Sequence, residues 1–194
     1  MSLKILGGCL KGFNLAVNDK VTRPTGVMLK RKIFDARQSL KNCLFVDLCA
    51  GSGSIGFEAL SRGARRVIFV ENNFLAFKNI SNAINEINHK ESVSKVLGKT
   101  SVEKQSADRW LKDKINTINE ENSIIFFDPP YEHVQLYEII FSTMRSSSYK
   151  GEFWVEYDLK GDKGVIKIVD DLFRDNGVKR YKHGQHEICI FQFE

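Results

Sequence analysis

The sequence predicts an α/β fold built on a largely parallel sheet, and three observations support this prediction. Residues 44–71 combine an apolar run, a glycine-rich turn, an amphipathic segment and a second apolar run, which is the pattern of a nucleotide-binding βαβ unit. Strand-like and helix-like segments then alternate as far as about residue 157, as expected for parallel strands joined by crossover helices. The run Ser123–Phe127 is continuously apolar, which is typical of a central parallel strand.

Length and composition indicate one such domain with a modest extension. The chain has 194 residues, and no apolar run approaches the ~18 residues of a membrane span. The N-terminus lacks the apolar core of a signal peptide, so we expect a cytoplasmic protein. The four cysteines show no C-x-x-C spacing, and His183 and His186 flank a predicted turn. We therefore expect no metal site.

Positive charge is concentrated before the βαβ unit. Residues 1–41 hold nine Lys or Arg against two Asp, a net charge of +7, so the rest of the chain carries −2 of the total of +5. A basic segment in front of a nearly neutral domain favours a polyanionic partner such as nucleic acid. A solvated basic face that only aids solubility is the alternative.

The first 41 residues predict a hairpin and a helix. Apolar runs at residues 3–6 and 13–17 surround a glycine-rich connection, which indicates a β-hairpin. Pro24 biases Arg23 toward extended backbone, and Thr25 can cap a helix that begins at residue 26 or 27. Apolar positions from Met28 to Leu40 follow helical spacing, with Lys30, Arg31 and Lys32 on the other flank.

The elements after residue 71 follow from periodicity. Residues 74–87 predict a core-facing helix, residues 93–97 a strand, and residues 98–105 a polar loop. Helices are expected from about residue 107 and over residues 136–144, and a strand over residues 153–157. Residues 165–169, 179–182 and 187–193 are predicted as the closing strands.

The glycine turn of the βαβ unit points to a nucleotide. Gly51, Gly53 and Gly56 give the spacing Gly-x-Gly-x-x-Gly, and Glu71 follows 20 residues after Gly51. Glycines let backbone N–H groups approach a ligand closely, and an acid at the end of the second strand can accept ribose hydroxyls. The same spacing is typical of dinucleotide-binding oxidoreductases, which remain an alternative. Asp47 favours a different ligand, because a carboxylate before this turn repels a pyrophosphate and suits a cation such as the ammonium group of S-adenosylmethionine.

A second motif, Asp128-Pro129-Pro130-Tyr131, follows the strand at residues 123–127 and therefore lies at the same edge of the sheet. Its prolines lack N–H donors, which leaves the Asp128 carboxylate and the Pro129 carbonyl to accept both hydrogens of an exocyclic amine. Tyr131 offers a ring on which a base can stack. The two motifs together predict methyl transfer to an amine of an unpaired or flipped base, with catalysis by positioning and electrostatics.

These motifs resemble a known family. The segment DLCAGSGSIGFEALSRGA from Asp47 to Ala64 closely resembles the bacterial rRNA guanine-N2 methyltransferases of the RsmD family. The segment Thr22–Thr25 with the basic helix after it, the pattern Gly-Gly-x-x-Lys-Gly at residues 7–12, the Asp-Pro-Pro-Tyr motif and the ending over residues 181–193 are also similar to that family. The likeness covers nearly the whole chain.

The resemblance implies a Rossmann-like S-adenosylmethionine-dependent methyltransferase fold, with a seven-stranded, mostly parallel sheet and an antiparallel last strand. Residues 1–41 would form a basic RNA-binding extension, and residues 42–194 the methyltransferase domain. The implied reaction is methylation of the N2 amine of a guanine in 16S rRNA, within the 30S subunit, by a monomer without metal. The implied catalytic residues are Asp128, Pro129, Pro130 and Tyr131. The implied cofactor-binding residues are Asp47, Cys49, Gly51, Ser52, Gly53, Glu71, Asn72, Ser106, Ala107 and Asp128. The implied RNA-binding residues are Lys4, Lys11, Arg23, Lys30 and Arg31.

The sequence departs from the family at three positions. Cys49 stands where an aromatic residue is usual, and Lys30 where an arginine is expected. Ser106, with Asp108 two residues later, occupies the place of the acid or amide that faces the adenine.

Three other functions remain open at this stage. They are an amino-methyltransferase that acts on adenine or cytosine, an NAD-binding oxidoreductase and a non-catalytic RNA-binding assembly factor.

Overall fold

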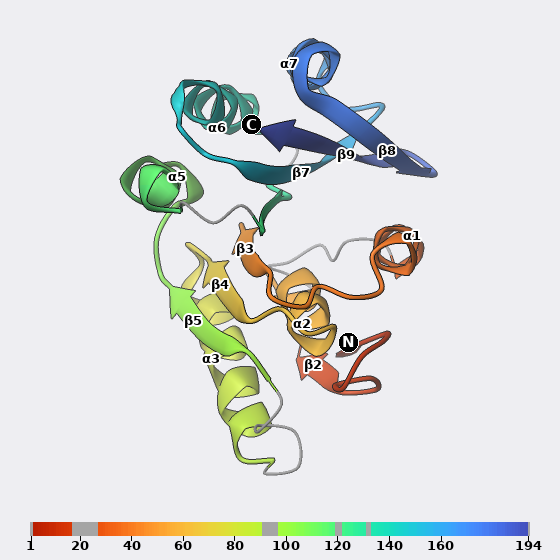
Figure 1. Cartoon of the computed structure of the whole chain (residues 1–194), viewed down its shortest axis with the longest axis vertical. Helices are drawn as coiled ribbons and strands as arrows, with labels where there is room; N and C mark the ends of the chain where they lie inside the picture. Colours follow the sequence, from red (N-terminus) through yellow and green to blue (C-terminus); the bar gives the residue numbers. More distant parts are fainter. Residues whose placement is uncertain (1, 17–26, 91–96, 119–121, 131–132, 194) are drawn as a thin grey trace.

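A computed structural model describes residues 2–16, 27–90, 97–118, 122–130 and 133–193 of the chain (Figure 1). Its strands are β1 Ser2–Lys4, β2 Asn14–Ala16, β3 Leu44–Leu48, β4 Arg66–Val70, β5 Lys99–Glu103, β6 Ser123–Phe127, β7 Gly151–Asp158, β8 Gly177–His183 and β9 His186–Phe193. Its helices are α1 Val27–Ala36, α2 Ser54–Ser61, α3 Phe74–Asn88, α5 Ala107–Lys114, α6 Val134–Ser146 and α7 Lys163–Asn176, with a 3₁₀ turn η1 over Ile115–Thr117.

The main sheet has seven strands in the order β5-β4-β3-β6-β7-β9-β8. The ladders from β5 to β7 are parallel, whereas β9 is antiparallel to both β7 and β8. This confirms the predicted seven-stranded, mostly parallel sheet with an antiparallel last strand. The order reverses at β3, and ligands of open α/β sheets bind at the carboxyl ends of the strands beside such a reversal.

Helices cover both faces of the sheet. Figure 1 shows α6 and α7 on one side and α1 and α2 on the other. The first core joins alternate strand residues such as Val46 to Trp110 of α5, Ile140 of α6 and Val169 of α7. The second core joins the other strand positions, such as Phe45, to α1, α2 and α3. The central parallel strands β3 and β6 are thus buried on both faces, which explains their apolar sequences.

The N-terminal segment shares the second core and is fastened to α2. Ile5, Leu10 and Leu15 are buried in that core together with α1. The carboxylate of Glu58, which is 0% exposed, accepts the N–H of Leu6 at 2.8 Å. Ser61 on the same helix accepts the N–H of Leu10 through its hydroxyl at 2.8 Å. Buried polar side chains of α2 therefore fix the hairpin in place.

Two sequence-based assignments are wrong. Residues 99–103 form β5 and not a loop, because an edge strand with partly exposed faces accepts polar residues. Residues 165–169 belong to α7 and not to a strand. Asp162 caps that helix by accepting the N–H groups of Gly164 and Val165, and its apolar positions recur at helical spacing.

The remaining assignments from residue 97 onward agree with the structure, as does the N-terminal hairpin. The strand predicted over residues 93–97 falls mainly on residues outside the described ranges. Among the helices that the structure describes, none is long and apolar enough to cross a membrane.

Candidate active site

The glycine turn joins β3 to α2 through a run of left-handed backbone. Cys49, Gly51 and Gly53 have φ values of 74°, 55° and 73°. The N–H groups of Cys49 and Ala50 both donate to the carbonyl of Val70, at 3.1 and 3.0 Å, which fastens the turn to β4. Gly56 lies in α2 so close to the strands that a Cβ there would be 2.3 Å from the Phe69 ring. Gly51 and Gly53 thus allow the left-handed backbone of the turn, and Gly56 allows α2 to pack closely against Phe69 of β4.

Asp47 lies beneath this turn at the end of β3. Its side chain is 2% exposed, and its Oδ2 accepts the N–H of Gly56 at 2.9 Å. Burial is the main cause that raises the pKa of this carboxyl to about 8; the Gly56 N–H opposes the shift, and the charges of Asp128 and Glu71 add to it. A cation beside Asp47 would favour the ionised form.

Glu71 connects the end of β4 to the turn. Its Oε2 accepts the N–H of Gly51 at 2.6 Å, and its Oε1 accepts the N–H of Asn73 at 2.6 Å. Asn73 in turn caps α3 by accepting the N–H groups of Leu75 and Ala76. These bonds hold the carboxylate in one orientation at the carboxyl edge, and each of its oxygens keeps a second lone pair for a ligand hydroxyl.

Four carboxylates act on Cys49: Asp47 of β3, Asp108 of α5, and Glu71 and Asp128, which directly follow β4 and β6. Burial raises the pKa of the Cys49 thiol well above its usual value, and Glu71, Asp128, Asp47 and Asp108 add to the shift in that order. Such a concentration of negative charge favours a cationic ligand and disfavours a pyrophosphate. The arrangement therefore supports the sequence-based preference for S-adenosylmethionine over a dinucleotide.

A cavity of about 380 Å³ opens beside Glu71, between the ends of β4 and β5. It is lined by Asn72, Lys104, Gln105, Ser106, Asp108 and Arg109. Both Ser106 and Asp108, the alternatives for the adenine contact, border it. Ser106 also stabilises the ionised form of Asp108 by a side-chain hydrogen bond, which lowers the pKa of Asp108. The cavity lies next to Glu71, the acid for which the sequence predicts ribose contacts, and this position suits a purine.

The second motif lies across β3 from this cavity. Leu48 pairs with Phe127, so Asp128 follows in the position beside Cys49. Pro129 is buried, Pro130 is exposed, and the N–H of His133 donates to the Pro130 carbonyl at 3.1 Å. Tyr131 lies outside the described residues. The structure thus brings Asp128 to the edge that holds Asp47 and Glu71.

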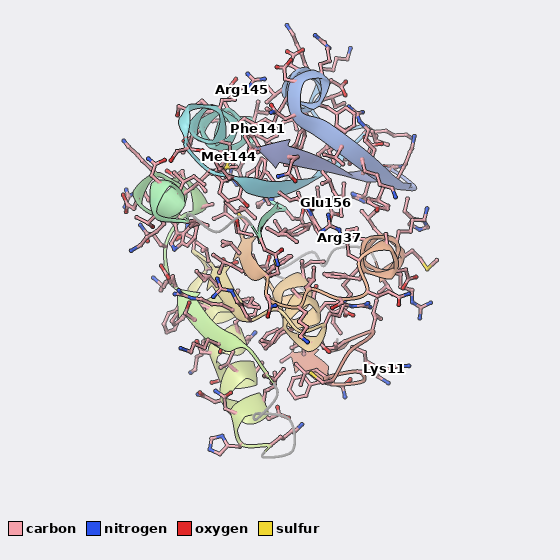
Figure 2. All side chains as sticks on the ribbon, in the orientation of Figure 1. Lys11, Arg37, Phe141, Met144, Arg145 and Glu156 are labelled. Atoms are coloured by element: carbon pink, nitrogen blue, oxygen red, sulfur yellow. The ribbon has the colours of Figure 1, made fainter. Side chains whose placement is uncertain are left out.

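Sequence reasoning missed Glu156 on β7. This carboxylate is 1% exposed, and it follows Val155, the partner of Phe127, so it is the neighbour of Asp128 in the next strand. Figure 2 shows Glu156 and Arg37 on the side of β7 that faces α1. The signal was present in the sequence, because an acid interrupts the apolar strand Phe153–Tyr157 on the face of Trp154.

The predicted RNA-binding residues have different environments. Lys4, Lys11 and Arg31 are exposed, and Figure 2 labels Lys11 at the N-terminal hairpin. Arg23 lies outside the described residues. The expectation for Lys30 requires correction, because its side chain is 2% exposed and its ammonium lies 3.9 Å from the Glu58 carboxylate. Burial lowers the pKa of Lys30, and Glu58 opposes that shift. A buried amine cannot contact phosphates at the surface.

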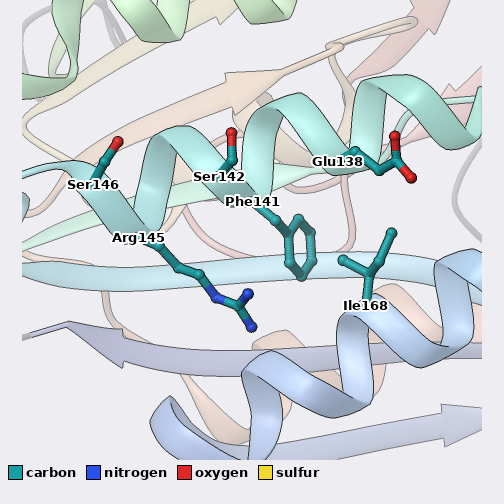
Figure 3. A pocket seen from close by; sticks show the side chains of 6 residues that line it. All are labelled: Glu138, Phe141, Ser142, Arg145, Ser146 and Ile168. Atoms are coloured by element: carbon teal, nitrogen blue, oxygen red, sulfur yellow. The ribbon is translucent and has the colours of Figure 1, made fainter.

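A second cavity of about 420 Å³ lies at α6 and α7, on the face of the sheet opposite to α1 and α2 (Figure 3). It is lined by Glu138, Phe141, Ser142, Arg145 and Ser146 of α6 and by Ile168 of α7. It is therefore separate from the carboxylate cluster. Within the described ranges, no group of three or more His, Cys, Asp or Glu side chains could hold a metal ion.

The fold and this site define a Rossmann-like methyltransferase, in which the glycine turn and the Asp-Pro-Pro motif share one edge of the sheet. The family model described as "Conserved hypothetical protein 95" matches residues 3–192. The chain therefore belongs to this family, the RsmD family of methyltransferases.

Individual relatives agree with this assignment. The chain is 29% identical over 171 residues to "Ribosomal RNA small subunit methyltransferase D" of Haemophilus influenzae, with 84% of this chain and 82% of the relative covered. It is 31% identical over 136 residues to "Putative rRNA methyltransferase YlbH" of Bacillus subtilis, with 69% and 70% covered. The structure of "Putative methyltransferase yhhF" of Escherichia coli matches with a TM-score of 0.73 and 19% identity over 100% of this chain and 99% of the other, which supports the fold alone.

Proposed function

We propose that the chain transfers a methyl group from S-adenosylmethionine to the N2 amine of a guanine in 16S rRNA, acting as a cytoplasmic monomer on the 30S subunit. The observation that carries this proposal is the convergence of Asp47, Glu71 and Asp128 around Cys49 at the carboxyl edge of the sheet. Relatives named as small-subunit rRNA methyltransferases support the choice of nucleic acid.

The residues present fit this cofactor. Bound S-adenosylmethionine would supply an electrophilic methyl group on a sulfonium. Glu71 would accept the ribose hydroxyls, since two backbone N–H groups already orient its carboxylate. Asn72, Ser106 and Ala107 would border the adenine in the 380 Å³ cavity. Asp47 would bind the ammonium group, and Cys49, Gly51, Ser52 and Gly53 would shape the turn around the cofactor.

The acceptor side would work by positioning. The Asp128 carboxylate and the Pro129 carbonyl would accept the two hydrogens of the guanine N2 amine and direct its lone pair at the methyl carbon. Formation of the nitrogen–carbon bond would break the bond between the methyl group and sulfur, with S-adenosylhomocysteine as the product. Positive charge would develop on the nitrogen, the carboxylate of Asp128 would stabilise it, and one of the two amine protons would then pass to that carboxylate. Pro130 would fix the backbone, and Tyr131, beyond the described residues, would stack on the base.

The direct test is methyl transfer to purified 30S particles that lack this modification. We expect tritiated methyl groups to appear in 16S rRNA and to be recovered as N2-methylguanosine after nuclease digestion. Asp128→Ala should abolish transfer and retain the affinity for S-adenosylmethionine within a few-fold. Asp175→Ala, a matched loss of an exposed carboxylate on α7, should behave as the wild type.

Three outcomes would favour the alternatives. Methylated adenine or cytosine would indicate another exocyclic amine as the acceptor. NADH binding tighter than S-adenosylmethionine binding would indicate an oxidoreductase. RNA binding without methyl transfer by the unmutated chain would indicate a non-catalytic assembly factor.

A further inference from the structure

Strand register connects the candidate active site to the C-terminal hairpin. Glu156, the neighbour of Asp128, pairs with Ile188 of β9, and Ile188 pairs with Tyr181 of β8. Residues paired in this way point to the same face of a sheet. Since β7 and β8 are both antiparallel to β9, they run in the same direction, and His183 lies at the edge that carries Asp128. Tyr181 is therefore on the face of Glu156 and at the same level of the sheet.

The outer strand β8 is basic and exposed. Its sequence Gly177–His183 contains Lys179, Arg180 and Lys182 and no acid. Arg180 points toward α7, where it pairs with Asp170 at 2.6 Å. Because side chains alternate along a strand, Lys179 and Tyr181 point toward α1, and the Lys179 ammonium lies 5.0 Å from the centre of the Tyr181 ring.

Helix α1 extends this basic surface. The Lys32 ammonium donates to the Lys182 carbonyl at 2.7 Å, so the exposed side of α1 adjoins β8. Lys32 is exposed there. We call Lys32, Lys179, Tyr181 and His183 the α1–β8 surface; it combines residues that are about 150 positions apart in the chain.

The opposite face of the same end of the sheet has a different charge. Helix α7 carries Lys163, Lys167 and Arg174 against Asp170, Asp171 and Asp175, which is a balanced set. By strand alternation, Arg180 and Lys182 of β8 also point to this face, and Arg180 is paired there with Asp170 and Glu187. Lys179, on the α1 face, lies beside the Tyr181 ring, which combines a cation and an aromatic group on one face.

We propose that the α1–β8 surface is a second rRNA contact, which binds phosphates beside the target nucleotide through Lys32 and Lys179 and stacks an unpaired base or sugar on Tyr181. Exposed cations interleaved with an aromatic ring are the groups that bind single-stranded RNA without reading its sequence. This proposal rests on the proposed function, because it names where the same substrate extends beyond the cleft.

The test compares two lysine variants of equal charge. Lys179→Ala removes a cation from the α1–β8 surface, and Lys167→Ala removes one from α7 on the opposite face. Affinity for undermethylated 30S particles is measured between about 50 and 200 mM salt. Log affinity falls as log salt concentration rises, and we expect Lys179→Ala to make this negative slope less steep by about 0.7–0.9, the value for one lost phosphate contact. Lys179→Arg should restore the slope, and Lys167→Ala should match the wild type.

Kinetics separate this proposal from the proposed function. Lys179→Ala should raise KM for the particle and leave kcat and the affinity for S-adenosylmethionine unchanged. If Lys179→Ala and Lys167→Ala give the same slope, or if the wild type does not bind the particle, the second contact is refuted. If the wild type binds but transfers no methyl group, the proposed function fails, and the comparison of slopes still decides the contact.

Discussion

Binding of S-adenosylmethionine should remove a proton from Asp47. In the structure, burial, together with the charges of Asp128 and Glu71, raises the pKa of this carboxyl to about 8. Asp47 is therefore mostly protonated at neutral pH when no cation lies beside it. A cofactor ammonium bound by the ionised form couples binding to the loss of that proton.

The size of the effect follows from this pKa. With a pKa of about 8, roughly 1% of Asp47 is ionised at pH 6 and roughly 9% at pH 7. The Kd for S-adenosylmethionine should therefore fall about ninefold between these pH values. The α-amino group of the cofactor, with an ordinary pKa of about 7.7–8.0, stays largely protonated in this range and contributes little.

Titration calorimetry in two buffers with different protonation enthalpies measures both Kd and the proton released. Asp47→Asn is the matched control, since its amide oxygen can still accept the N–H of Gly56 but cannot ionise. Its Kd should not change between pH 6 and pH 7. A wild-type Kd that is constant over this range, without proton release, would refute the contact between Asp47 and the cofactor.

Four further predictions concern stability. Asp47 keeps in the folded state a proton that the unfolded chain releases, so the free energy of unfolding should decrease from about pH 4 to about pH 8, and Asp47→Asn should flatten this decrease in urea titrations. Gly56→Ala should cost about 1–3 kcal/mol by thermal unfolding, because its Cβ would overlap the Phe69 ring. Glu58→Ala should cost about 3–5 kcal/mol in urea unfolding, because it leaves Lys30 and Arg62 without their buried carboxylate. Lys30→Met should leave RNA affinity unchanged and cost less stability than Glu58→Ala, because Glu58 keeps Arg62 as its partner, whereas a large loss of affinity would place Lys30 at the surface.

The candidate site could be predicted because its signals are local. Three glycines, an acid before them and an acid at the end of the next strand specify a turn whose geometry depends on a few consecutive residues. Asp128 was placed correctly for the same reason, since carboxyl ends of parallel strands meet at one edge. Glu156 was missed because its proximity to Asp128 depends on the pairing of β6 with β7, which no single segment encodes.

Helical geometry could have corrected the assignment of Lys30. At 100° per residue, Lys30 lies between Ile33 and Phe34 in angular position, within the apolar side of α1. Arg31 and Lys32 lie beyond that arc and are exposed. The strand predicted over residues 165–169 was wrong for a related reason. Their apolar positions suit either a strand or a helix, and the helix cap at Asp162 decides for the helix.

The excess positive charge of residues 1–41 is not all available at the molecular surface, and part of the exposed positive charge comes from outside this segment. Among the cations of residues 1–41, Lys30 pairs with the buried carboxylate of Glu58. Arg37 pairs with Glu152, and its guanidinium lies over the Trp154 ring. These residues fasten α1 to the sheet and are less available to RNA. Lys179, outside the basic segment, is in turn exposed on the face of the sheet that α1 covers. The proposed RNA interface would need α1 to be held rigidly against the sheet, because Lys32 can act together with Lys179 only if α1 and β8 keep a fixed separation.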